Sequence, residues 1–253
     1  MCLALLAIGA HERYAVVVAA NRDEFHERAA APASWWPEGW LAGRDLAAGG
    51  TWLGVTRAGR WGLITNVREP GRHDVAAPSR GTLVPSMLAE TAPVLERLER
   101  TVAGAMRHNG FNLVAGTCRE AHWGSNRTTT PLSLATGVYG LSNAALDTPW
   151  PKVVRTKAAL TDWCERGDND LEPLFGVLGD RAGAPDAELP ATGLTHERER
   201  LLSAPFIVSA EYGTRCSTVL TIGHDGTARF VERSFDAAGR SIGVVDERFR
   251  IAG

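Results

Sequence analysis

The chain has 253 residues, 44% of them hydrophobic, so it holds enough apolar material for an ordinary globular core and is not disordered as a whole. Its 27 Lys and Arg residues nearly balance 29 Asp and Glu residues, which gives a formal charge of -2. This balance excludes the cation excess on which binding to nucleic acid depends. We expect a single domain over residues 1–253 and no nucleic-acid partner.

The chain has four cysteines, Cys2, Cys118, Cys164 and Cys216, and no two of them form a C-x-x-C pair. They are too sparse for a disulfide framework and therefore predict reduced thiols. The apolar segment at the start of the chain lacks a basic region and ends at His11, too early to span a membrane. We expect a cytoplasmic protein without a membrane span.

No metal or phosphate motif is evident. The 7 histidines lack the spacing of a metal-binding motif such as H-E-x-x-H, so we predict no metal site and no bound cofactor. Gly43-Arg44-Asp45 and Gly49-Gly50 lack the strand-to-helix context of a phosphate-binding loop. We interpret their glycines as turn residues.

The first predicted element is a β-hairpin. Residues 2–9 and 14–20 are apolar runs of strand length, and the charged residues between them suit a turn. Residues 15–20 are apolar at every position, which is typical of a strand covered on both faces. The hairpin is therefore expected near the middle of a sheet.

Residues 27–50 are rich in Pro and Gly and contain three tryptophans, which predicts a long ordered loop. Trp35, Trp36 and Trp40 would either wall an apolar pocket or pack on the sheet. A second hairpin is predicted from residues 51–56 and 61–66, because the four residues between them include Gly59.

The rest of the chain alternates between groups of strands and groups of helices. This order favours antiparallel sheets covered by helices over βαβ alternation. Pro93 and Pro151 suit the first turns of helices. The predicted elements are two helices within 79–107, strands at 111–117, 121–123 and 136–141, a helix at 151–166, a weakly helical segment at 167–190, and a hairpin of 216–222 and 227–235 around Asp225-Gly226.

Cys2 is the strongest candidate for a reactive residue. The initiator methionine is normally removed before a small residue, which would leave a thiol and a free α-amine on the same residue. An α-amine ordinarily has a pKa of about 7.7 to 8.0 and a thiol one of about 8.5, so the amine can accept the thiol proton near neutral pH. The alternative is a structural cysteine in a first strand.

The opening hairpin brings charged residues to Cys2. A turn centred near residue 11 would place Cys2 opposite Ala20 or Asn21, at a strand spacing of about 4.8 Å. Asp23 could then orient the amine or thiol of Cys2, and Arg22 could lower the pKa of the thiol. Strand alternation puts Asn21 and Asp23 on one face and Arg22 on the other. The alternative is that these polar residues simply end the strand.

Short motifs spread over almost the whole chain resemble the NRDE family, which includes the Transport and Golgi organisation 2 proteins. The motifs are Met1-Cys2-Leu3-Ala4, Asn21-Arg22-Asp23-Glu24, Leu41-Ala42-Gly43-Arg44-Asp45, Gly49-Gly50-Thr51-Trp52-Leu53-Gly54, Thr65-Asn66-Val67-Arg68, Ser79-Arg80-Gly81, Gly140-Leu141-Ser142-Asn143 and Trp150-Pro151-Lys152.

More remotely, the layout is similar to the cysteine N-terminal-nucleophile hydrolases, the group of choloylglycine hydrolases and penicillin acylases. This resemblance implies an α+β fold, a four-layer αββα sandwich with largely antiparallel sheets. It also implies catalytic roles for Cys2 as nucleophile, Asp23 as orienting carboxylate, Asn66 and Asn143 near an oxyanion hole, and Arg215 as a late supporting residue. Ordinary strand-end roles are the alternative for the two asparagines.

The hydrolase group typically shows Arg-Asn-x-Asp, where this chain has Ala20-Asn21-Arg22-Asp23. The arginine therefore stands two places later and on the opposite face of the strand. We do not assume that it replaces the missing arginine. Substrate-binding roles are assigned to Asn21, Arg22, Glu24 and Trp52.

Two functions are compatible with these motifs. The first is a cofactor-free hydrolase or acyltransferase, in which Cys2 attacks the acyl carbon of a small amide or related acyl substrate and forms a thioester. The second is a non-catalytic protein that binds or traffics an apolar ligand such as haem or lipid, because eukaryotic members of the family are associated with haem mobilisation, lipid handling and secretory organisation. The sequence does not indicate the oligomeric state.

Overall fold

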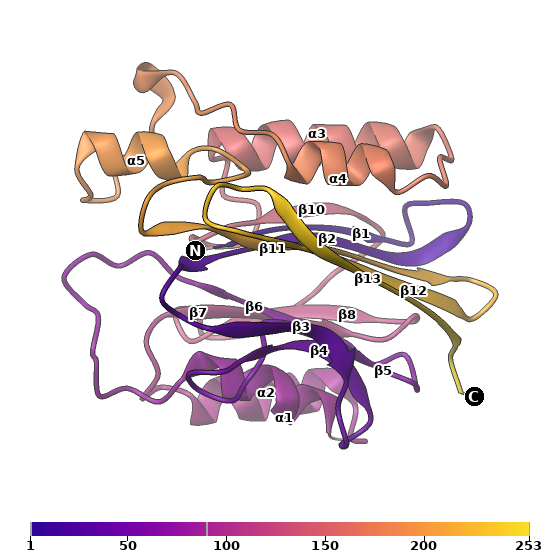
Figure 1. Ribbon diagram of the computed structural model, residues 1–253. Helices are drawn as coiled ribbons and strands as arrows, with labels where there is room; N and C mark the ends of the chain where they lie inside the picture. The colour runs from indigo at the N-terminus through magenta and orange to yellow at the C-terminus, as the bar shows by residue number, and fades with distance from the viewer. Residues whose placement is uncertain (1, 90, 253) are drawn as a thin grey trace.

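The structure is a computed structural model that describes residues 2–89 and 91–252, with only the backbone of Cys2. Two antiparallel β-sheets face each other, and helices cover the outer face of each (Figure 1). The four-layer αββα arrangement expected from the sequence is confirmed. No helix of the described residues is long and apolar enough to cross a membrane.

The first sheet has six strands, in the order β10-β1-β2-β11-β12-β13. The opening hairpin β1–β2 is central, as predicted, because its apolar residues face a core on both sides. The strands are β1 (Cys2–Ile8), β2 (Tyr14–Phe25), β10 (Gly137–Leu141), β11 (Tyr212–Gly223), β12 (Thr227–Phe235) and β13 (Ser241–Arg250).

The second sheet has seven strands in sequence order, from β3 to β9. These strands are β3 (Ala30–Trp35), β4 (Trp40–Asp45), β5 (Leu53–Thr56), β6 (Trp61–Asn66), β7 (Phe111–Gly116), β8 (Ala121–Ser125) and β9 (Leu132–Ser133).

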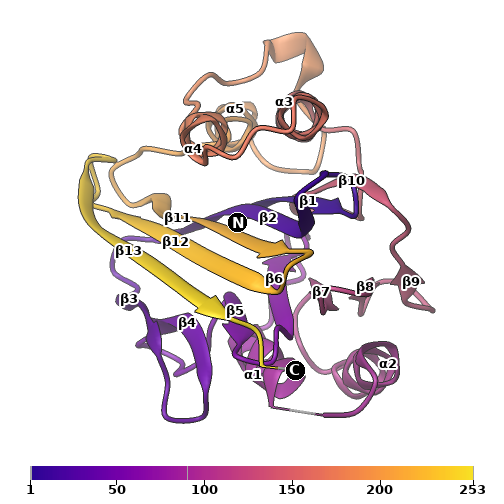
Figure 2. The ribbon, with the colours of Figure 1, turned by 90° about the vertical axis from the view of Figure 1, so that its right-hand side faces the viewer.

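The helices lie on the outer faces of the two sheets, the later ones on the first sheet and the earlier ones on the second (Figure 2). Pro93 precedes one helix and Pro151 opens another, as predicted. The helices are α1 (Leu83–Leu88), α2 (Val94–Gly104), α3 (Pro151–Glu165), α4 (Glu172–Leu178) and α5 (His196–Leu202), and two 3-10 turns span Arg80–Thr82 and Asp186–Glu188.

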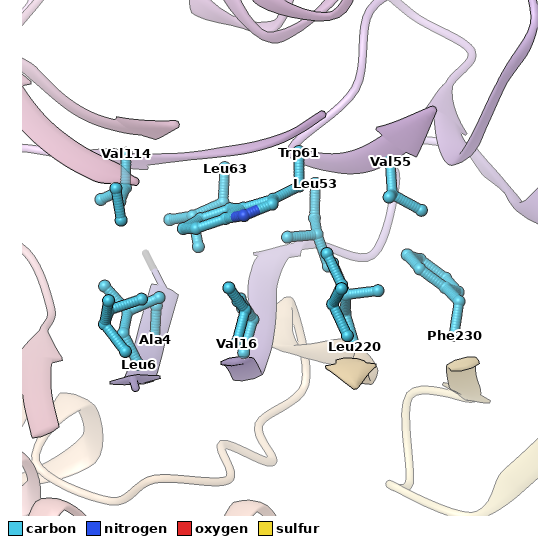
Figure 3. Close-up of a cluster of buried hydrophobic side chains, with 14 of the residues drawn as sticks. Ala4, Leu6, Val16, Leu53, Val55, Trp61, Leu63, Val114, Leu220 and Phe230 are labelled. Atoms are coloured by element: carbon cyan, nitrogen blue, oxygen red, sulfur yellow. The ribbon is translucent and has the colours of Figure 1, made fainter. Parts of the chain in front are cut away.

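The main core lies between the sheets. Figure 3 shows side chains of β5, β6 and β7 facing side chains of β1, β2, β11 and β12. Trp61 is fully buried at its centre, and its indole N–H donates to the carbonyl of Thr117 at 3.2 Å. Because this core joins both sheets, its packing determines how they sit on each other.

The predicted loop at residues 27–50 is wrong: the segment forms the hairpin β3–β4. Pro32, which cannot donate to a sheet ladder, falls at a register shift between Ala31 and Ser34, so the pairing continues around it. The backbone N–H of Ala33 instead donates to the Glu232 carboxylate of the other sheet at 2.7 Å. This contact from a distant strand is not visible in the local sequence.

The predicted register of the opening hairpin is also wrong. Cys2 pairs with Arg22 rather than with Ala20 or Asn21, because the turn is centred on Glu12. Buried His11 shapes this turn, since its Nδ1 accepts the backbone N–H groups of Arg13 and Tyr14 at 3.0 and 3.3 Å. These bonds within the turn stabilise the register that the structure shows.

Besides β3 and β4, three further elements of the structure are absent from the sequence prediction, namely β9, α5 and β13. β13 pairs with β12 over nearly its full length, although most of its residues are exposed. Beyond it, the N–H of Ala252 donates to the carbonyl of Arg57 at 2.8 Å, so the end of the chain bridges the two sheets. Long-range pairing, not an apolar pattern, defines this strand.

Candidate active site

A polar cavity of about 260 Å³ lies at the end of the sandwich where β2 leaves the first sheet and β4 and β6 end in the second. Five of the residues singled out from the sequence line it, and they come from segments far apart in the chain. These five are Arg22, Asp23, Glu24, Trp52 and Asn66, and the other lining residues are Arg28, Asp45, Thr51, Ile64, His73, Asp74, Val75, Ala77, Pro78, Ser79, Arg80, Gly81 and Asn109.

The segment 73–81 forms one wall of the cavity and is held by polar contacts. Asp74 and Asn109 exchange two hydrogen bonds of 2.8 Å, and Arg80 donates to the carbonyl of Gly110 at 3.0 Å. Val75 lies in this wall and is 91% exposed. This wall thus adds an exposed aliphatic side chain to the polar residues of the cavity.

Cys2 is positioned by its backbone, as the register partner of Arg22 in the β1–β2 pair. The Cα atoms of directly opposed residues in antiparallel strands lie about 4.5 to 5.5 Å apart. The side chain of Cys2 lies outside the described residues, so its place follows from strand register alone. This register puts the predicted nucleophile beside a residue that lines the cavity.

Asp23 is buried at the edge of this cavity. Its Oδ1 accepts the hydroxyl hydrogen of Thr214 at 2.7 Å, and its backbone carbonyl accepts from the Tyr212 hydroxyl at 3.0 Å. Burial raises the pKa of Asp23, and the charge of Lys152 and the Thr214 hydrogen bond oppose this shift. Thr214 of β11 therefore holds the carboxyl in one place, and opposing electrostatic effects determine its pKa.

Arg22 is 5% exposed and is fixed on two sides. Its guanidinium lies over the ring of Trp52 at 4.5 Å, a cation–π contact, and its Nη2 donates to Asp45 at 3.3 Å. The Nη1 of Arg22 is buried, with no hydrogen-bond acceptor among the described residues. The guanidinium of Arg22 is therefore fixed in position, and its hydrogen-bonding capacity is only partly used.

Asp45 links Arg22 to Arg28, which donates from Nε at 2.6 Å. Its other oxygen accepts the backbone N–H groups of Ala47 and Ala48 at 3.0 and 3.1 Å. Burial alone would raise the pKa of Asp45, but these hydrogen bonds and the charges of the two arginines outweigh it and hold the pKa below its ordinary value. Asp45 is therefore an ionised anchor for both arginines.

Asn66 and Asn143 meet at the end of β6. The side-chain amide of Asn143 donates to the backbone carbonyl of Asn66 at 2.8 Å, and the Asn143 carbonyl accepts from the N–H of Arg68 at 2.7 Å. Asn66 lines the cavity, whereas Asn143 is 1% exposed and lies behind it. The two predicted oxyanion-hole residues are thus adjacent but differently placed.

Arg215 and Asn21 do not line the cavity. Arg215 donates from Nη1 to the carbonyls of three residues at and just beyond the end of β2, namely Phe25, His26 and Arg28. Asn21 faces the helical layer, where it donates to the carbonyls of Leu178 and Pro205 at 2.8 and 2.9 Å. Both side chains brace the strand that carries Arg22 and Asp23.

Comparison with known proteins identifies the family of this chain. The sequence model of the Transport and Golgi organisation 2 family matches residues 1–237. The chain belongs to this family. It is 36% identical to the Transport and Golgi organization protein 2 homolog of Bos taurus and 33% identical to that of Homo sapiens, in each case over 240 residues and 87% of both chains.

The fold of this family member resembles that of a bile acid hydrolase. The C2A mutant of the conjugated bile acid hydrolase from Clostridium perfringens superposes with a TM-score of 0.55 over 98% of this chain and 92% of that chain. A second variant of the same hydrolase gives a TM-score of 0.51 over 98% of this chain and 97% of that chain. Sequence identities of 8% and 10% limit the likeness to the fold.

Two glycines of the family motifs make room for the site, a role that the sequence analysis missed. A Cβ on Gly43 would lie 2.3 Å from the ring of Trp52, the residue under Arg22. A Cβ on Gly50 would lie 2.3 Å from the carbonyl oxygen of Gly81, which accepts the N–H of Thr51 at 3.0 Å. Gly43 is therefore not a turn residue but a strand residue at a close approach.

Lys152 is a further residue that sequence reasoning left without a role. It stands in the first turn of α3 but is only 1% exposed, and its Nζ donates to the carbonyl of Leu202 at 2.9 Å. A lysine is rarely buried without a partner group. The sequence signal for this unusual position was the place of Lys152 in the motif Trp150-Pro151-Lys152. Among the described residues, no three His, Cys, Asp or Glu side chains cluster as metal ligands.

Proposed function

We propose that this family member is a cofactor-free hydrolase or acyltransferase that acts on a C–N amide or related acyl bond of a small molecule. Cys2, exposed as the first residue by removal of Met1, would be the nucleophile. The observation that supports the proposal is the β1–β2 register, which pairs Cys2 with Arg22, a residue that lines the polar cavity together with Asp23 and Asn66. We also propose that residues 1–253 form a single domain.

The reaction would proceed in two steps. The α-amine of Cys2 takes the thiol proton, the sulfur attacks the acyl carbon, and the proton passes to the leaving amine as the C–N bond breaks. Water, or another acceptor in a transferase, then attacks the thioester and releases the thiol. Asp23, which is anchored by Thr214, would orient the ammonium formed in the first step.

The other predicted residues would stabilise charge or hold the site in shape. Asn66 lines the cavity and is the better placed donor for a developing oxyanion. Asn143 already donates to the backbone of Asn66, which supports a positioning role. Arg215 and Asn21 would support β2, while Glu24 and Trp52 would contact the substrate beside Arg22.

The test is the mass of the intact protein before and after brief alkylation at neutral pH, with mapping of each cysteine. We expect a chain that begins at Cys2, and a Cys2 thiol that reacts at least about tenfold faster than exposed Cys118, because a neighbouring base and cations favour the thiolate. Cys118→Ala serves as the control and should leave this rate unchanged. Retention of Met1, or an inert Cys2 beside a reactive Cys118, would contradict the proposal.

The second candidate is non-catalytic binding of haem or lipid, and a separate groove favours it. This groove of about 770 Å³ lies beside α5, with Leu201, Phe206 and Ile207 among its apolar residues and Arg181 and Arg198 among its charged ones. Its volume suits a drug-sized amphipathic ligand, for which pockets span about 300 to 1,000 Å³. Titration with haem should shift the Soret band at micromolar concentration, and an unshifted spectrum would remove haem as the ligand.

We also propose that the protein works in the cytoplasm. Among the described residues, Cys118 and Cys164 form no disulfide, which is typical of a reducing compartment. Fractionation of cells that express the untagged chain would test this location.

A further inference from the structure

We propose that the substrate of this site carries a carboxylate, and that Arg22 binds it through Nη1 next to the reacting acyl group. This inference rests on the proposed function, because only an enzyme has a substrate with a reacting acyl group. The anion-binding site itself follows from the geometry of Arg22. It narrows the substrate to small amides with an anionic group close to the scissile bond.

Arg22 has a hydrogen-bonding group that no described residue satisfies. Its side chain is 5% exposed, and its Nη1 is buried without an acceptor among the described residues. A buried donor without a partner costs about 1 to 3 kcal/mol, and more when it is charged. A bound oxygen would supply the missing acceptor, and a carboxylate would do so with the strongest hydrogen bond.

The guanidinium of Arg22 is held in one orientation before any ligand arrives. Trp52 lies against its face at 4.5 Å, and Asp45 holds Nη2 at 3.3 Å. Gly43 leaves the space that the Trp52 ring occupies. A pre-organised cation loses little conformational entropy on binding, so its interaction with an anion is not offset by ordering of the side chain.

The carboxylates near Arg22 do not satisfy its Nη1. Asp45 makes four contacts, with Nη2 of Arg22, with Arg28 and with the N–H groups of Ala47 and Ala48. Glu24 approaches Nη2 of Arg22 only to 4.0 Å, and Glu232 interacts with Arg22 electrostatically. Nη1 therefore has no acceptor among the described residues.

The position and size of the site also limit the substrate. Arg22 is the register partner of Cys2, and it lines a second, smaller cavity of about 100 Å³ as well as the main one. The main cavity, at about 260 Å³, falls below the range of about 300 to 1,000 Å³ that is usual for drug-sized ligands. A compact substrate whose carboxylate and acyl carbon are only a few bonds apart matches both observations.

The test compares two small amides that differ only in the proposed group, N-acetylglycine and N-acetylglycinamide. Binding is measured by NMR titration at pH 7 on the Cys2→Ala variant, in which no turnover alters the compounds. We expect the acid to bind at least about tenfold more tightly than the amide, because it alone forms the charge-assisted hydrogen bond. Equal affinities, or no binding of the acid, would overturn the inference.

Variants then locate the preference. Arg22→Gln should abolish it, whereas Arg57→Gln should leave it intact. Arg57 is a matched control because it also stacks on a tryptophan, with 3.8 Å to the ring of Trp35, but does not line the cavity. A preference that survives in folded Arg22→Gln would overturn the inference. If that variant does not fold, Arg22→Lys is used, and an undiminished preference there would overturn the assignment of the carboxylate to Nη1.

The two proposals fail separately. If Cys2 resists alkylation in the unaltered chain while the acid still binds through Arg22, the enzyme proposal falls and the anion site stands. If Cys2 is reactive and the acid shows no preference, the carboxylate inference falls and the enzyme proposal stands.

Discussion

Buried ionisable side chains are the feature of this protein that matters most at the scale of single residues. Glu232 is 1% exposed, and its oxygens accept the N–H of Ala33 at 2.7 Å and the hydroxyl of Thr218 at 3.2 Å. Burial raises its pKa above the ordinary value near 4.5, although these bonds, that of Cys216 and the charge of Arg22 act in the opposite direction. Glu232 therefore joins β12 to β3 at an electrostatic cost.

This cost predicts a pH dependence of stability. Because the pKa of Glu232 is higher in the folded state, the folded chain holds a proton that the unfolded chain releases, so the free energy of unfolding falls as pH rises from about 4.5 through the raised pKa. Glu232→Gln removes this titration but keeps an acceptor for Ala33. The free energy of unfolding of Glu232→Gln, minus that of the unaltered chain, should therefore rise with pH by on the order of 1 kcal/mol.

Urea unfolding at a series of pH values above 4.5 measures this difference. Glu38→Gln, which alters an exposed carboxylate, is the control and should follow the unaltered chain. The explanation would be wrong if Glu232→Gln and the unaltered chain lost stability in parallel.

At the scale of elements, the hairpin β3–β4 and the start of β5 shape the candidate site more than the helices do. Gly43 in β4 admits the ring of Trp52, and Trp52 supports Arg22 from β2 of the other sheet. A strand residue of one sheet thus controls the orientation of a cation in the other.

Gly43→Ala should therefore displace Trp52 and disturb the site. The new methyl group would lie 2.3 Å from the indole ring, which cannot yield without moving away from Arg22. We expect a loss of about 1 to 3 kcal/mol in unfolding free energy and weaker binding of N-acetylglycine. Gly104→Ala is the control, because nothing lies within 4 Å of its Cβ, and it should be neutral or slightly stabilising. Similar losses in both variants would show that Trp52 is not the cause.

At the scale of the whole molecule, the core between the sheets determines their relative placement and with it the cavity. Leu220 of β11 is fully buried in this core and faces the strands of the second sheet (Figure 3). Arg22 and Asp45 belong to different sheets, so their contact depends on the same packing. Stability and site geometry are therefore coupled.

Leu220→Ala should lower the free energy of unfolding by about 2 to 5 kcal/mol, because it removes buried surface and leaves a cavity. Denaturant unfolding measures the loss. Leu132→Ala is the control, since Leu132 is 50% exposed in β9, and it should change stability by less than about 0.5 kcal/mol. A core that tolerates Leu220→Ala as well as it tolerates Leu132→Ala would contradict this account of the sheet packing.

The sequence by itself predicted the features that depend on neighbours in the chain. Both early hairpins, the helices after Pro93 and Pro151 and the hairpin around Asp225-Gly226 follow from apolar periodicity and turn chemistry, and all are present. The family motifs identified the polar segment Asn21-Arg22-Asp23-Glu24, and Arg22, Asp23 and Glu24 do line the cavity. These signals are local, so the sequence carries them without the fold.

Only the tertiary structure decided what depends on contacts between distant residues. The register that pairs Cys2 with Arg22 follows from the side chain of His11, and the hairpin β3–β4 draws on a contact with Glu232. The burial of Lys152 and the space that Gly43 leaves for Trp52 depend on elements far away in the sequence. Such contacts have no local signature, because burial and pairing are properties of the packed sheets rather than of any one segment.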